Sequence, residues 1–338
     1  MSTQPSTVLT NEPDEPIVWV KHETKAKKGL EKNRPSPRSG HSMNVIGASA
    51  FLFGGLCEVN NPNSREEDFD DTMAQGSKDL FRLQLVSAGG MEWECVKNAQ
   101  GEGEAPPARW KHTANLFDNT QLLVFGGFHT TEHRLNDIWI FDAVAYAWRQ
   151  PNRAHNVEAS KPFQLSNQEW NNVPPPRGGH SATLIGDLLY VFGGYGGLGY
   201  GRRDLDDLYA LNIDTWKWTK IAAKGTYPDR RSGHQACAVE KKIYIFGGSN
   251  SVTQFSDLHC LDTEQDPPLW TKLSCDLSSP TWNQAACSIV AIPTWKIFTF
   301  GGCTGLLDDR DRVGAMTNAA HILDTGTSKS KSKSKIDF

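Results

Sequence analysis

Residues 177–194 read RGGHSATLIGDLLYVFGG, and this stretch decides the fold because the chain repeats its pattern. An arginine and a histidine start one strand pattern, a short turn follows, and an apolar run then ends in a glycine pair. Five runs of this kind occur in the chain, at 51–55, 123–127, 190–194, 243–248 and 297–302. Four of them follow a histidine that lies about a dozen residues earlier: His41, His112, His180 and His234. Repetition on this scale determines the architecture before any single residue matters.

The spacing of the glycine pairs defines the repeating unit. The first glycines stand at 54, 126, 193, 247 and 301, so successive pairs are 72, 67, 54 and 54 residues apart. The shorter spacings match the roughly 50 residues of a four-stranded propeller blade, and the longer ones leave room for loop insertions. In each unit the histidine lies on strand a and the glycine pair ends strand b. Strand c then begins with an aspartate, and a short strand d carries the tryptophans: Trp93, Trp148, Trp216 with Trp218, and Trp270.

The repeated residue types have structural roles that follow from their chemistry. Glycine adopts positive φ without strain and lets another backbone approach closely. The glycine pairs are Gly54, Gly55, Gly126, Gly127, Gly193, Gly194, Gly247, Gly248, Gly301 and Gly302. Tryptophan on strand d buries a large flat surface between neighbouring sheets. Because these residues recur in every unit, we interpret them as parts of the scaffold and not as catalytic groups.

The combined pattern Gly-His…Phe-Gly-Gly…Asp-Leu-Tyr…Trp resembles the kelch-repeat family of β-propellers over residues 17–325. This resemblance implies an all-β fold of four-stranded antiparallel blades. Five repeats are recognisable, whereas kelch rings usually have six or seven, so a sixth blade or a shortened chain stays open as an alternative. The fifth unit departs from the pattern, since Trp282-Asn-Gln replaces Gly-His. The plan of a bare propeller is similar to the Rab-effector type of kelch protein.

The two ends of the propeller segment complement each other. The fifth unit has a strand c pattern at 319–325 but no following tryptophan strand, while Ile17-Val-Trp-Val-Lys21 precedes the first unit with the spacing of a strand d. The sequence therefore predicts that this N-terminal strand, with Trp19, completes the last blade and removes an open sheet edge. We expect residues 1–16 and the Ser/Lys-rich residues 326–338 to be disordered.

Composition excludes several classes of function. The net charge of −4 does not favour nucleic acid, and no apolar stretch is long enough to predict a membrane span. The N-terminus lacks the apolar core of a signal peptide. The seven cysteines are scattered without a Cys-x-x-Cys pair, which is typical of a reducing compartment. These features predict a cytoplasmic protein, with the nucleus as the alternative location.

Motifs for chemistry are missing from the sequence. The ten histidines show no metal-ligand spacing on a predicted helix, and no Gly-x-Ser-x-Gly elbow or phosphate loop occurs. We therefore predict no catalysis, no cofactor and no metal. The alternative is a small-molecule enzyme or specifier protein, as in some kelch relatives, with its site in the channel mouth. Three clustered carboxylates or histidines there would favour that alternative.

One face of the predicted propeller is much more elaborate than the other. The b–c and d–a connections emerge on the same face, and they hold the insertions at 56–78, 97–107, 128–136, 149–175, 195–206, 273–281 and 303–318. Binding residues favour such loops on a rigid scaffold, which predicts that another protein binds this face, through an acidic or extended segment. The sequence leaves the oligomeric state open.

Candidate contact residues on this face fall into two groups. Five arginines start the a strands and are expected to ring the channel mouth, where they would bind carboxylates or brace the loops: Arg38, Arg109, Arg177, Arg230 and Arg231. The loops add aromatic anchors and further positive charge: Phe128, Tyr195, Tyr200, Arg202 and Arg203.

Overall fold

The structure, a computed structural model, describes residues 25–26, 34–57, 75–86, 90–97, 105–151, 172–197, 201–274, 288–292, 296–300, 303–304, 315–316 and 320–324. The sequence-based boundaries at 1–16 and 326–338 lie outside these residues, as do Trp19, Tyr200, Gly301 and Gly302. All regular structure longer than one turn in the described part of the chain is β-strand.

Four antiparallel sheets each contain four strands in sequence order, and we call them blades 1 to 4. Blade 1 consists of β3 (Ser42–Ile46), β4 (Ser49–Phe53), β7 (Leu80–Val86) and β8 (Gly90–Cys95). Blade 2 consists of β9 (Thr113–Phe117), β10 (Gln121–Phe128), β11 (Arg134–Asp142) and β12 (Ala147–Arg149). Blade 3 consists of β14 (Ser181–Ile185), β15 (Leu188–Phe192), β18 (Leu208–Asn212) and β19 (Lys217–Lys220). Blade 4 consists of β21 (Gln235–Val239), β22 (Lys242–Phe246), β23 (Leu258–Asp262) and β24 (Leu269–Leu273).

Further short strands extend these sheets. A three-stranded sheet follows blade 4, formed by β25 (Ser288–Ile292), β26 (Lys296–Phe300) and β29 (Ala320–Asp324). Blades 1 and 4 each gain one parallel strand at their outer edge, β1 (Lys25–Ala26) beside β8 and β20 (Lys224–Gly225) beside β24. Small sheets lie beyond the glycine pairs: β2 (Arg38–Ser39), β5 (Leu56–Cys57) and β6 (Gln75–Gly76); β13 (Arg177–Gly178), β16 (Tyr195–Gly196) and β17 (Arg203–Asp204); and β27 (Cys303–Thr304) with β28 (Ala315–Met316).

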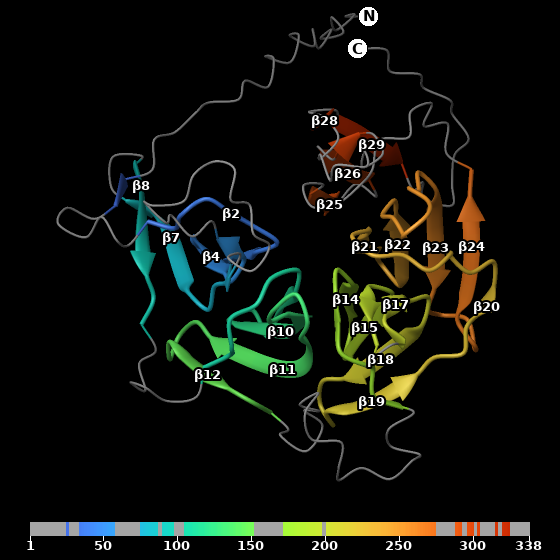
Figure 1. The fold of residues 1–338 in the computed structure, drawn as a ribbon, viewed down its shortest axis with the longest axis horizontal. Helices are drawn as coiled ribbons and strands as arrows, with labels where there is room; N and C mark the ends of the chain where they lie inside the picture. Colours follow the sequence, from blue (N-terminus) through green and yellow to red (C-terminus); the bar gives the residue numbers. More distant parts are fainter. Residues whose placement is uncertain are drawn as a thin grey trace, which may run out of the picture.

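The sheets are arranged around a common centre in chain order, from blue through red in Figure 1. Their first strands β3, β9, β14, β21 and β25 are neighbours in that same order. This is the arrangement of a kelch-type β-propeller, in which strand a lines the centre and strand d lies outermost. The predicted closing strand at 17–21 falls outside the described residues.

The core lies between the blades and is built from one repeated aromatic contact. Phe125 of strand b in blade 2 contacts His180 and Trp218 of blade 3, with ring centroids 5.1 Å apart in both pairs. The same arrangement joins blades 1 and 2 and blades 3 and 4: Phe53 with His112 and Trp148, and Phe192 with His234 and Trp270. Each interface is therefore assembled from residues of two successive repeats.

Blade 3 corrects one sequence-based assignment. The d-strand position is occupied by Trp218, which is 6% exposed and pairs with Leu211, and not by Trp216. Trp216 lies in the c–d turn with φ of +57°, and Tyr146 occupies the same kind of turn in blade 2 with φ of +52°. The two tryptophans are two residues apart, so strand alternation alone did not separate the buried one from the one in the turn.

The first glycine of the pair in blades 1 to 3 lies against a backbone carbonyl of the next blade. A Cβ built on Gly193, which has φ of +62°, would lie 2.8 Å from the Arg231 carbonyl oxygen. Gly54 and Gly126 meet the carbonyls of Arg109 and Arg177 at 2.7 and 2.9 Å in the same way. These separations are shorter than any side chain tolerates, so the blades approach this closely only because glycine occupies the position.

Candidate partner-binding face

Three of the predicted channel-mouth arginines are buried in the blades. Arg109, Arg177 and Arg231 are 0% exposed, and each forms two parallel hydrogen bonds with the repeated aspartate in or just before strand c of its own blade. The partners are Asp137 at 2.7 and 2.8 Å, Asp207 at 2.6 and 3.0 Å, and Asp257 at 2.6 and 3.1 Å. Each guanidinium also donates to the carbonyl of the first glycine of the pair, at 2.9 Å.

This placement differs from the expected ring of open guanidiniums and agrees with the other role considered for these residues, bracing of the loops. A buried arginine whose donors are committed to a carboxylate and a carbonyl cannot turn outward without leaving that carboxylate unpaired. In blade 4, burial alone would raise the pKa of Asp257, but hydrogen bonds from His259 and Arg231 hold it well below its usual range. Contacts to a partner must therefore come from other side chains.

Arg38 of blade 1 occupies the equivalent position in a looser form. It is half-buried, donates to the Gly54 carbonyl at 2.9 Å, and lies 5.0 Å from the ring centroid of Phe81. Ser77 stands between it and the strand c aspartate, since the Ser77 hydroxyl donates to Asp79 at 2.9 Å. The first blade therefore lacks the tight bidentate pair of its neighbours.

The remaining predicted arginines lie on the surface. Arg230 is exposed and stands 3.9 Å from Asp206. Arg203 is exposed on β17, and Arg202 pairs with Glu132, which links the b–c loops of blades 2 and 3. These three side chains are accessible, although each exposed ion pair contributes little by itself.

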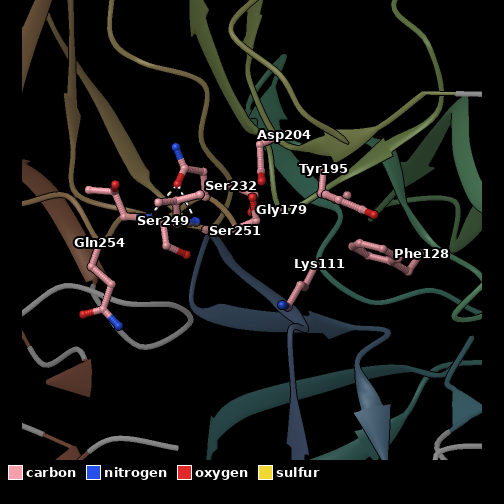
Figure 2. Close-up of a pocket in the computed structure, with 14 residues that line it drawn as sticks. Lys111, Phe128, Gly179, Tyr195, Asp204, Ser232, Ser249, Ser251 and Gln254 are labelled. Atoms are coloured by element: carbon pink, nitrogen blue, oxygen red, sulfur yellow. Dashed lines mark hydrogen bonds between the residues drawn. The ribbon is translucent and has the colours of Figure 1, made fainter. Parts of the chain in front are cut away.

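A pocket of about 500 Å³ opens on the predicted face, where blades 2, 3 and 4 meet (Figure 2). Its walls come from the residues just after the glycine pairs and from the starts of the a strands: Lys111, Phe128, Gly178, Gly179, Tyr195, Asp204, Ser232, Gly233 and residues 249–254. The pocket therefore combines b–c loops with d–a connections. It includes two of the predicted anchors, Phe128 and Tyr195.

The residue after the glycine pair differs in each of blades 1 to 4, and in blades 2 to 4 it lines the pocket. These residues are Leu56, Phe128, Tyr195 and Ser249, and they pair with Ser39, Trp110, Gly178 and Ser232, respectively. The backbone pairing is the same in all four blades, while the side chains range from leucine through aromatic rings to serine. The repeat therefore supplies a constant backbone frame on which unlike side chains line the pocket.

Phe128 and Tyr195 are held by a cation between them. The Arg134 guanidinium carbon lies 5.1 Å from the Phe128 ring centroid and 5.0 Å from that of Tyr195, and Arg134 itself is 9% exposed. Trp110 stacks on the other side of Phe128, with centroids 5.6 Å apart and planes 19° apart. These contacts restrict the arrangement of both rings in the pocket wall.

The opposite wall is a polar loop of blade 4. The Asn250 side-chain oxygen accepts hydrogen bonds from the backbone nitrogens of Val252 and Thr253, at 2.9 and 2.7 Å. Ser249 pairs with both Ser232 and Gln254 through backbone bridges. This loop therefore presents hydroxyl and amide groups from a backbone that is held by its own hydrogen bonds.

Below the rim, the strand a histidines join the blades. His234 lies 2.9 Å from the Ser181 hydroxyl, His180 lies 3.0 Å from the Thr113 hydroxyl, and His112 makes the equivalent contact with Ser42 at 2.8 Å. Burial and the neighbouring arginine lower the pKa of His234 to about 3, and the same causes hold the pKa of His112 and His180 well below their usual values. These histidines are neutral structural groups at physiological pH.

The described residues contain neither a cluster of metal-binding side chains nor a helix that could span a membrane. No group of three or more histidine, cysteine, aspartate or glutamate side chains in those ranges is placed to hold a metal ion. In the same part of the chain, no helix is long and apolar enough to cross a membrane.

Sequence reasoning missed Trp110, Lys111, Arg134, Asp204 and the loop at 249–254. Lys111 had a visible signal, because it stands in Arg-Trp-Lys-His where the other three units have glycine before the histidine. Arg134 and Asp204 had no such signal in the sequence. Each lies in an insertion of different length, and only the folded chain places it beside the pocket.

Comparison with known proteins identifies related sequences. A sequence profile described as "KLHDC2/KLHL20/DRC7 Kelch-repeats domain" matches residues 160–335. The chain is 29% identical over 310 residues to "Dynein alpha chain, flagellar outer arm" of Chlamydomonas reinhardtii and 30% identical over 276 residues to "Host cell factor 1" of Homo sapiens. It is 27% identical over 275 residues to "Leucine-zipper-like transcriptional regulator 1 homolog" of Drosophila melanogaster.

These similarities cover 87%, 74% and 79% of this chain, respectively. They cover only 6%, 12% and 24% of the three relatives. The shared part is therefore a small portion of each of these larger proteins.

Proposed function

This chain belongs to the kelch-repeat family, and from that premise we propose that it is a non-enzymatic scaffold or adaptor. It binds another protein on the face formed by its b–c and d–a loops. The pocket between blades 2, 3 and 4 is the centre of that site, with Phe128 and Tyr195 as anchors. The whole relatives' own activities do not transfer, because this chain spans only a small part of each.

The observation that carries this proposal is the contrast between the residues that line the pocket and the repeated residues beneath them. Apart from the recurring glycines Gly179 and Gly233, the pocket lining is drawn from positions that vary between blades, whereas the residues beneath it recur. Partly buried aromatic anchors beside a polar wall are the composition expected of a protein-binding site. The loops of this face also carry Arg202, Arg203 and Arg230 at the surface. Arg202 and Arg230 stand beside Glu132 and Asp206, so the support for an acidic or extended partner segment comes mainly from the exposed Arg203.

The alternative, a small-molecule enzyme or specifier protein, is less well supported. It would need a cluster of acid and base groups in the mouth. Among the described residues that line the pocket, Asp204 is the single carboxylate and none is a histidine. The buried histidines are instead committed to hydroxyl groups of the neighbouring blade.

A peptide-selection experiment tests the proposed face. Random peptides displayed on a surface are selected on the full chain and then measured against a double variant, Phe128→Ala with Tyr195→Ala. We expect the double variant to lose about 2 kcal/mol or more of binding free energy, because both anchors are truncated. Lys241→Ala, in the exposed a–b turn of blade 4, is the matched control on the opposite face. Equal affinities of the double variant and wild type would contradict the proposal.

We also propose that the ring has five blades and is closed by residues 17–21. The supporting observation is a shared register. Lys224 stands six residues after Trp218 and pairs with Leu269, just before Trp270 of the next blade. Lys25 likewise stands six residues after Trp19 and pairs with Glu92, just before Trp93. The segment before blade 1 therefore pairs with the outer edge of that blade in the same register as the segment after β19 of blade 3 pairs with the outer edge of blade 4.

A further inference from the structure

Blades 1 to 4 share a pair of facing positions at the mouth whose side chains change from blade to blade. The residue after the glycine pair lies opposite the residue that stands three positions before the strand c aspartate. These facing pairs are Leu56 with Gly76, Phe128 with Arg134, Tyr195 with Asp204, and Ser249 with Gln254. The same backbone pairing thus carries a glycine, an arginine, an aspartate or a glutamine, so the scaffold itself does not require a carboxylate in blade 3.

Asp204 is the charged member of this set that is covered by protein and has no partner. It is 8% exposed and lines the pocket on the same wall as Tyr195 (Figure 2). Within the part of the chain that the structure describes, no group forms a hydrogen bond or an ion pair with its carboxylate, while Lys111, the other charged residue of the lining, has an interaction of its own. The Asp204 oxygens are not fully enclosed either, so they are accessible from the pocket.

The arginines around this wall are committed to other groups. Arg177 is held by the aspartate of its own blade. Arg134 lies between the two aromatic anchors and donates to the Glu132 carbonyl at 3.2 Å, and Arg202 pairs with the carboxylate of the same residue. Arg203 precedes Asp204 on β17, but it is exposed where Asp204 is buried, because successive side chains of a strand point to opposite sides.

A carboxylate in this situation favours a cation from outside the chain. Aspartate is rarely covered without a partner, because removing its charge from water is costly, and a cation brought beside it offsets that cost. An ammonium or guanidinium group would form a charge-assisted hydrogen bond with it. A divalent metal ion fits less well, since it takes several oxygen ligands and Asp204 is the one carboxylate among the described residues of the lining.

We propose that Asp204 is the specificity-determining anion of this pocket and binds one cationic group of the partner segment beside the Tyr195 ring. That group is a lysine or arginine side chain or a free amino terminus. This inference rests on the proposed function and names the chemistry that the pocket selects. Acidic residues of the same segment would meet the exposed Arg203, which does not line the pocket.

The test uses peptides selected on the wild-type chain, as for the proposed face, and then synthesised. We expect them to share one basic residue or to require a free amino terminus. Replacing the basic residue by glutamine, or acetylating the amino terminus, tells which cation is bound. Asp204→Asn should weaken binding by about ten-fold or more, the effect of losing a charge-assisted hydrogen bond. Its melting temperature should stay the same or rise, because an unpaired, covered carboxylate is removed.

Three further variants separate the role of the charge from other effects. Asp206→Asn makes the same chemical change at an exposed carboxylate outside the pocket lining, and it should keep the affinity within about two-fold of wild type. Asp204→Glu keeps the charge and should bind the peptides more tightly than Asp204→Asn does. Asp204→Lys should reject the original peptides and bind versions in which glutamate replaces the basic residue.

Several outcomes would overturn the inference. Affinity of Asp204→Asn within about two-fold of wild type would do so, and so would peptides that keep their affinity after each cation is removed. A lower melting temperature that accompanies the loss of affinity in Asp204→Asn would show a structural role instead. If the peptides still depend on Phe128 and Tyr195 in these cases, the proposed face stands and only the role of Asp204 fails. A selection that yields no binding peptide contradicts both.

Discussion

The inner positions of blades 2 to 4 and the rim above them share one repeated backbone but differ in how much their side chains vary. Inside, Arg109, Arg177 and Arg231 make the same bidentate pair and the same glycine contact in each blade. At the rim, equivalent positions hold phenylalanine, tyrosine and serine. Buried charged groups tolerate no change of partner, whereas rim side chains face a pocket and are free to differ.

The largest expected effect tests the inner positions. Arg177→Ala should destabilise the protein by about 3–5 kcal/mol, because it leaves Asp207 without its partner. Arg38→Ala removes the looser contact of blade 1 and should cost about 1 kcal/mol. Urea unfolding of the two variants measures both changes. Equal losses would mean that the bidentate pair adds nothing beyond the single carbonyl contact.

A similar loss is expected where the proposed ring closes. If Trp19 occupies the d-strand position of the last blade, Trp19→Ala should cost about 3–5 kcal/mol, as truncation of a buried tryptophan does. Trp218→Ala is the positive control and Trp216→Ala, in the c–d turn, is the control for a half-buried tryptophan. A Trp19→Ala variant that unfolds at the wild-type urea concentration would contradict closure by residues 17–21.

The third prediction concerns the stability of the folded protein at low pH. The pKa of His234 is about 3 in the folded state against 6.5 for an unperturbed histidine, so the unfolded chain binds a proton that the folded protein does not. Stability should therefore fall as the pH drops through that interval, by up to about 1.4 kcal/mol per pH unit for each such histidine. His112 and His180 contribute in the same direction.

Urea midpoints measured across this interval check the acid prediction. His234→Gln should lower the free energy of unfolding. It should also reduce the slope of that free energy against pH by the contribution of about one proton. His129→Gln, in the exposed b–c loop of blade 2, is the matched control for replacing a histidine outside the interfaces between blades. The same slope in His234→Gln and wild type would show that His234 is not the group responsible.

Much of the scaffold could be predicted from the sequence, because each scaffold residue makes a contact that recurs. Gly-His, Phe-Gly-Gly, Asp and Trp stand at fixed places in the repeat, and each meets a repeat partner in the structure. Trp216 shows the limit of this reasoning, since its neighbour Trp218 fits the same pattern and only the turn geometry separates them. The arginines show a second limit of this reasoning. A repeated cation in the sequence does not indicate whether the carboxylate that pairs with it belongs to the same chain or to another molecule.

The sequence by itself determined that the chain is all-β and built from repeated four-stranded units, and it predicts which face carries the long connections. These follow from local pattern and spacing, which are properties of one repeat at a time. Only the tertiary structure decided which side chains meet at the mouth, since Lys111 stands just before strand a of blade 2, Arg134 comes from the insertion at 128–136, and Tyr195 and Asp204 come from the insertion at 195–206. It also decided that the arginines are buried, because their charge is satisfied by an aspartate roughly half a repeat further along the chain.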